Sequence, residues 1–95
     1  MTDLPAYVWE YEIEGMEERI FLQIYEPKPL EQDWVCERRL TGPITGFNKI
    51  KKIYGVDKAQ ALELTLQIIP AELSYISDKL GRRITRLGDP SASLM

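Results

Sequence analysis

The sequence predicts an α+β fold: a four-stranded antiparallel meander sheet with one long C-terminal helix packed on one face. Two observations support this. The residues before Gly55 contain several runs in which apolar and polar side chains alternate, the period of a strand with one buried face. Residues 58–80 instead repeat apolar side chains at spacings of four and three, the period of one helix face. A sheet and a helix of this kind bury their apolar faces against each other in two layers.

The first two strands are predicted at residues 7–14 and 19–26, where large apolar side chains occupy every second position. The four residues between them are expected to form a hairpin loop. Pairing Glu14 with Arg19 gives a register that keeps the large apolar side chains on one face and provides Glu14 with a cationic neighbour on the other.

The segment that follows is predicted to be a connector over residues 26–33. Its two prolines have no backbone N–H, so we expect them to exclude it from ladder pairing. The third strand is predicted at residues 34–41, with Trp34, Cys36 and Leu40 facing inward. Arg38 is expected near the sheet edge, where its stem can lie on apolar surface.

Residues 41–46 are predicted to form a turn region, and residues 47–54 a fourth strand. Phe47, Ile50 and Ile53 are three positions apart, so this strand should begin irregularly or contain a bulge. Residues 82–87 allow two alternatives, a short edge strand or a segment that runs along the surface.

The predicted helix has end signals at both termini. Asp57 is a natural N-cap, Gln60 can complete a capping box, and Gly81 suits the left-handed position after the last turn. The inward stripe is expected to be Leu62, Leu66, Ile69, Leu73, Ile76 and Leu80. It is widened by Ala59, Ala61, Leu64 and Ile68, so the first three turns should be the more buried part.

Pro70 interrupts the helix on its polar face. A proline there removes one hydrogen bond and clashes with the preceding turn. Because the stripe continues in phase past Pro70, we expect one kinked helix that bends toward the sheet. The alternative is a break, with a second helix beginning at Pro70.

Composition indicates one domain, residues 1–87, followed by a flexible tail at residues 88–95. The sequence has no histidine and a single cysteine, so no catalytic residue, cofactor or metal site is predicted. Cys36 is expected to be buried and structural. No apolar run reaches membrane-spanning length and no signal peptide is present, so a cytoplasmic location is the expectation.

Charge is divided unevenly along the chain. Residues 1–33 hold nine acids and two bases, whereas residues 34–95 hold six acids and ten bases. The two halves are expected to pair across the sheet, or alternatively to present an acidic edge to a basic partner. The net charge of −3 argues against nucleic acid as a partner, despite a local cluster formed by Arg82, Arg83 and Arg86.

The uncovered sheet face is the predicted interaction surface. Glu10, Glu12 and Glu14 share that face, where carboxylates either bind calcium, act as an acid–base pair or simply meet solvent. Apolar and aromatic residues share it too, and the register places Val8 opposite Tyr25. An aromatic patch beside acids is typical of protein–protein surfaces. The candidate residues are Val8, Glu10, Glu12, Phe21, Tyr25 and Val35.

The chain also resembles a family of small uncharacterised bacterial proteins, a domain of unknown function. The resemblance rests on the W-x-C pattern of Trp34 and Cys36, which precedes a G-x-D-x-x-Q-A-L helix start at residues 55–62. It covers roughly residues 7–80. It implies a bacterial cytosolic protein and transfers no catalytic or binding residue.

Three functions remain open. The first is a non-enzymatic interaction module, of immunity or accessory type, that binds another protein. The second is a ligand-binding or weakly catalytic domain with a cleft between helix and sheet that uses Arg38, Glu37 or Tyr54. The third is a self-associating structural homodimer.

Overall fold

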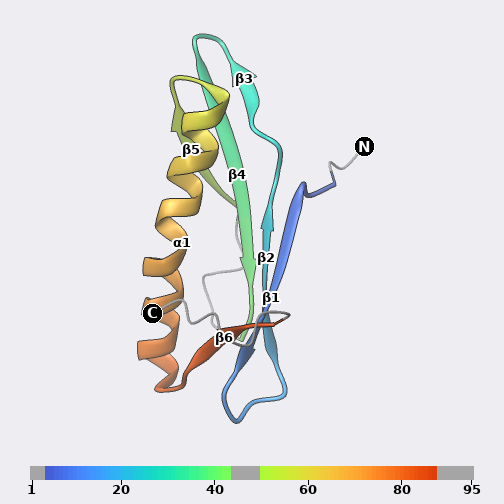
Figure 1. Cartoon of the computed structure of the whole chain (residues 1–95), viewed down its shortest axis with the longest axis vertical. Helices are drawn as coiled ribbons and strands as arrows, with labels where there is room; N and C mark the ends of the chain where they lie inside the picture. The colour runs from blue at the N-terminus through green and yellow to red at the C-terminus, as the bar shows by residue number, and fades with distance from the viewer. Residues whose placement is uncertain (1–3, 44–49, 88–95) are drawn as a thin grey trace.

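The computed structural model describes residues 4–43 and 50–87, which form one sheet and one helix. Figure 1 shows the helix standing along one face of the sheet over most of its length. The α+β class and the antiparallel sheet are as predicted, but the sheet has six strands among these residues, not four. The elements are β1 (Tyr7–Ile13), β2 (Arg19–Ile24), β3 (Lys28–Leu30), β4 (Asp33–Thr41), β5 (Ile50–Gly55), α1 (Lys58–Leu80) and β6 (Ile84–Arg86).

The four predicted strands lie in the meander order, β1–β2–β4–β5. β4 is the central strand, since β2 and β5 pair with its opposite edges: Arg38 has Ile24 as its partner on one side and Lys51 on the other. The predicted turn at 41–46 and the irregular start of the fourth strand fall largely on residues 44–49, outside the described residues. The predicted tail at 88–95 also lies outside them.

β3 corrects the prediction that the proline-containing connector stays out of the sheet. Lys28 and Leu30 flank Pro29 in a short strand that pairs with the beginning of β4. Pro29 is tolerated because β3 lies at an edge, where a missing N–H leaves no neighbouring strand unpaired. β2 and β3 follow one edge of β4, and the register shifts by one residue between them, so the intervening segment contains a β-bulge.

β6 resolves the open alternative after the helix in favour of an edge strand. It pairs antiparallel with β1, with Ile84 opposite Ile13. The pairing extends to Leu87, whose N–H donates to the carbonyl of Glu10 at 2.8 Å. Ile84 is fully buried, so this strand closes the core at the hairpin end of the sheet.

The hairpin register differs by two residues from the prediction. Glu12, not Glu14, lies opposite Arg19, and the loop has five residues instead of four. Two local features explain the shift. Gly15 adopts φ +76°, and the N–H of Glu14 donates to the carbonyl of Arg83, which places Glu14 in the β6 ladder. A shift of two residues leaves every side chain on its predicted face.

The helix is continuous through Pro70, as the first alternative predicted, and both ends are capped as expected. The Asp57 carboxylate accepts from the Gln60 N–H at 2.7 Å, and the Gln60 side chain accepts from the Val56 N–H at 2.7 Å. Gly81 has φ +64° at the C-terminal end. No helix in the described part of the chain combines the length and apolar character needed to span a membrane.

The buried face of α1 is rotated from the predicted stripe in its first half. Ala61 and Thr65 are fully buried there, whereas Leu62 is half-buried and Leu66 is 44% exposed. The cause is a close approach at Gly55: a Cβ there would lie 2.5 Å from the backbone nitrogen of Ala61. Small side chains therefore fill this contact. Burial then continues to Ser77, so the first three turns are not the more buried part.

One helix cannot cover this sheet. Five strand positions spaced ~4.8 Å apart span roughly 20 Å, whereas a helix with its side chains is about 10 Å wide. α1 packs mainly against β4 and β5. The core lies beneath it and extends to β1, β2 and β6, with Trp9 and Trp34 partly buried at its margin. Its buried apolar residues are Tyr11, Ile13, Ile20, Leu22, Ile24, Cys36, Leu40, Ala61, Ile69, Leu73, Ile76 and Ile84.

Candidate functional site

The predicted interaction residues lie on the sheet face opposite α1, which we call the outer face. Strand alternation places them there, because their neighbours along each strand, such as Tyr11, Leu22 and Cys36, are buried beneath the helix. Val8 is 56% exposed and Phe21 is 41% exposed. Tyr25 and Val35 are half-buried.

The corrected register changes which of these residues are neighbours. Val8 lies opposite Gln23, not opposite Tyr25 as predicted. Phe21 lies directly between Glu10 of β1 and Thr41 of β4. The outer face therefore has an apolar and acidic group at Val8, Glu10 and Phe21. Arg39 and Glu37 of β4 lie between this group and Val35.

A second apolar group on the outer face was not predicted. Tyr54 of β5 lies opposite Val35 and is 52% exposed, and Ile50 lies opposite Arg39 and is 43% exposed. The spacing of Phe47, Ile50 and Ile53 obscured the alternation of this strand. Its pairing with β4 is the signal that assigns Ile50 and Tyr54 to the outer face.

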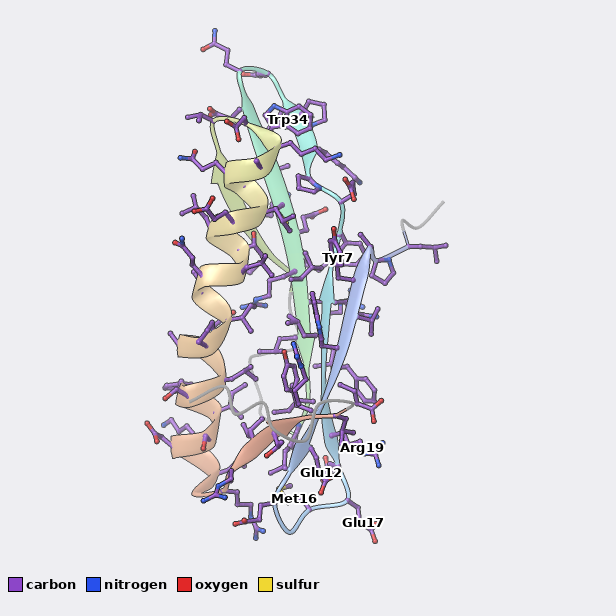
Figure 2. All side chains as sticks on the ribbon, in the orientation of Figure 1. Tyr7, Glu12, Met16, Glu17, Arg19 and Trp34 are labelled. Atoms are coloured by element: carbon purple, nitrogen blue, oxygen red, sulfur yellow. The ribbon has the colours of Figure 1, made fainter. Side chains whose placement is uncertain are left out.

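Charged side chains on the outer face pair across strands. Arg19 donates to the Glu10 carboxylate, and Glu12 lies opposite Arg19 at the hairpin end (Figure 2). Glu37 of β4 lies opposite Lys52 of β5. Among the described residues, no group of His, Cys, Asp or Glu side chains could hold a metal ion. Each of these pairs joins residues from the same half of the chain, so the pairs do not test the prediction that the acidic residues 1–33 and the basic residues 34–95 pair across the sheet.

Arg38 corrects the prediction that placed it near the sheet edge. It is only 5% exposed, on the inner face of the central strand β4. Its guanidinium forms two hydrogen bonds with the carboxylate of Glu72 in α1, one of them from Nε to Oε1 at 2.9 Å. Lys51 Nζ lies 3.9 Å from the same carboxylate. Glu72 was not predicted as a partner of Arg38, although an arginine at an inward strand position indicates that an acidic side chain must pair with it.

The predicted cleft does not form from Arg38, Glu37 and Tyr54. Arg38 faces the helix and is paired there, whereas Glu37 and Tyr54 lie on the outer face. A groove between helix and sheet is present elsewhere, beside Pro70, and none of these three residues lines it.

Cys36 is buried and facing inward, as predicted. Its Sγ donates to the Tyr25 carbonyl at 3.5 Å. Burial is the main effect and raises the pKa of this thiol; the Thr65 hydroxyl lowers it in part, and the nearby carboxylates of Glu26 and Glu37 raise it again. A raised pKa lowers the thiolate fraction at neutral pH, and the thiolate is the reactive form.

We therefore expect Cys36 to react with 5,5′-dithiobis(2-nitrobenzoic acid) at pH 7.5 at least ~100-fold more slowly in the native protein than in denaturant. A Cys36→Ala/Ala71→Cys variant is the matched control, since Ala71 is exposed on α1 and a thiol there should react rapidly. Equal rates for native Cys36 and the Ala71→Cys thiol would contradict the structural role.

Comparison with known proteins gives one finding. A family model described as "Domain of unknown function (DUF6968)" matches residues 8–94. The match continues well beyond Gly81, further than the resemblance at residues 7–80 predicted. No curated protein matches the chain, and no solved structure matches it.

Proposed function

We propose that this chain, which belongs to the family described as Domain of unknown function (DUF6968), is a non-enzymatic protein–protein interaction module that binds a partner protein through the outer face. The observation that carries this proposal is the exposure of Val8 and Phe21 beside the carboxylate of Glu10. α1 lies on the opposite face of the sheet, so the outer face remains for a partner.

The chemistry of the outer face suits a polar, wet interface. Exposed apolar side chains at Val8, Phe21, Ile50 and Tyr54 are interspersed with charged pairs, and interfaces of non-obligate complexes combine apolar anchors with a polar rim. The size and the net charge of −3 fit a small acidic accessory or immunity-type protein of the bacterial cytoplasm that binds a larger partner. In this proposal the outer face supplies binding, and no residue of it performs chemistry.

The test compares two lysine variants of the tagged full chain in the cells that encode it. Val8→Lys/Phe21→Lys places charge on the apolar group of the outer face, whereas Val56→Lys is a matched control at an exposed site after β5. We expect the double variant to recover at least ~10-fold less of a specific partner than Val56→Lys, at equal stability in chemical denaturation. Equal recovery with both variants would contradict the proposal.

A second copy of the chain is the alternative occupant of this face. Light scattering across a concentration series measures the mass directly. A dimer that Val8→Lys/Phe21→Lys converts to monomer would replace the proposed partner with self-association, and a monomer at all concentrations would remove this alternative.

A further inference from the structure

The inner face of the sheet has a region that α1 leaves incompletely covered. The helix packs mainly against β4 and β5, and on the inner side of β1 the burial of Ile13 and Tyr11 decreases toward Trp9 and Tyr7. Trp9 is half-buried, and Tyr7 stacks on it with ring centroids 5.7 Å apart while remaining exposed. Figure 2 shows Tyr7 near the open end of β1, away from the hairpin.

A groove of about 130 Å³ lies in this region. Its floor is the apolar inner surface of β1 and β2, and its wall is the middle of α1. Leu66 is part of this wall. It belongs to the predicted apolar stripe of the helix and yet remains 44% exposed, because it faces the groove and is not covered by the sheet. The lining residues are Trp9, Tyr11, Leu22, Leu66, Ile69, Pro70 and Arg86.

Two polar groups come together at the β6 side of the groove. Tyr11 and Arg86 are directly opposite each other in the β1–β6 ladder, a spacing of about 5 Å between Cβ atoms. Burial raises the pKa of the Tyr11 phenol, and the positive charge of Arg86 acts in the opposite direction, in accord with their proximity. A guanidinium has five N–H donors, so Arg86 can bind a carboxylate in addition to its contacts within the protein.

We propose that this groove binds a small aromatic carboxylate, with the ring on Trp9, Leu22 and Ile69 and the carboxylate on Arg86. The groove of about 130 Å³ is close in size to an apolar cavity of roughly 150 Å³ that holds one benzene ring. Arg86 is the charged residue among the described side chains that line the groove, so its positive charge favours an anion over a neutral or cationic ligand of the same shape. Small-molecule sites commonly combine an apolar floor with a few polar groups that converge at one end, as they do in this groove.

The experiment titrates the full chain with three probes of nearly equal shape: phenylacetate, phenylacetamide and benzylamine. Binding is followed by the NMR shifts of the Trp9 indole N–H and the methyl groups of Leu66 and Ile69. We expect phenylacetate to shift these signals saturably and to bind at least ~10-fold tighter than phenylacetamide, because a charged pair is stronger than a neutral hydrogen bond. Benzylamine should bind most weakly.

Two variants and one control locate the site. Arg86→Gln should make phenylacetate and phenylacetamide bind equally, and Leu66→Ser should weaken both from an exposed position that folding tolerates. Arg83→Gln removes a positive charge from an exposed residue outside the groove and should leave both affinities unchanged. Absence of saturable shifts with phenylacetate, shifts at residues outside the groove, tighter binding of benzylamine, or loss of binding in Arg83→Gln would each overturn the proposal.

Discussion

Replacing Arg38 with methionine is expected to lower the free energy of unfolding by about 3 kcal/mol, because it leaves the Glu72 carboxylate without its principal partner. The side chains of Arg38 and Glu72 are only 6% and 13% exposed, so water replaces little of the lost interaction. Lys51 Nζ also lies 3.9 Å from this carboxylate, but the Lys51 side chain is half-exposed. A loss of this size is a large fraction of the stability of a domain of 95 residues. Urea denaturation followed by tryptophan fluorescence measures it.

The double variant Arg38→Met/Glu72→Met is the control for this prediction. Replacing both partners with apolar side chains removes the unpaired charge, so we expect the double variant to recover most of the loss. The difference between the double variant and the sum of the single variants gives the coupling free energy. A single variant Arg38→Met as stable as the wild type would show that this pair does not connect the helix to the sheet.

Replacing Gly55 with alanine is expected to cost about 3 kcal/mol for a steric reason. The new Cβ would lie 2.5 Å from the Ala61 nitrogen and 2.8 Å from its Cα. Both are backbone atoms, so no side-chain rotation relieves the clash and the start of α1 must move away from β5. Thermal or urea denaturation measures the change.

Two further variants separate this clash from other effects of glycine. Ala61→Gly should not rescue Gly55→Ala, because the clash involves backbone atoms that Ala61→Gly retains. Gly81→Ala meets no neighbouring atom but forces alanine into φ +64°, so we expect a smaller loss of roughly 1 kcal/mol. Full rescue by Ala61→Gly would show that the Ala61 methyl, and not the helix backbone, limits the approach.

Much of the fold follows from local patterns. The alternation in residues 7–14, 19–26 and 34–41 assigns side chains to faces correctly, and Asp57, Gln60 and Gly81 mark the ends of the helix. These features depend on backbone geometry within a few residues, so a single sequence contains them. The edge strands β3 and β6 are different. Each has three residues and is stable only because a longer strand is already in place beside it.

For the candidate site, the sequence predicted correctly on which sheet face the residues lie, but not which residues lie opposite each other. Val8, Glu10 and Phe21 lie on the outer face as expected, yet the two-residue shift of the hairpin changes the partner of Val8. Patterns of period two cannot distinguish registers that differ by two residues. Tyr54 was assigned to a cleft, and only its pairing with Val35 places it on the outer face.

The sequence by itself determined the α+β class, the limits of the helix and the face to which most strand side chains point. Tertiary structure decided the rest: the exact register, the pairing of Arg38 with Glu72, the exposure of Leu66 and the groove beside Pro70. The physical reason is the distance along the chain over which the deciding interactions act. Periodicity and capping depend on interactions within one element, whereas these features depend on how closely α1 approaches β5 at Gly55 and on how much of the sheet a single helix can cover.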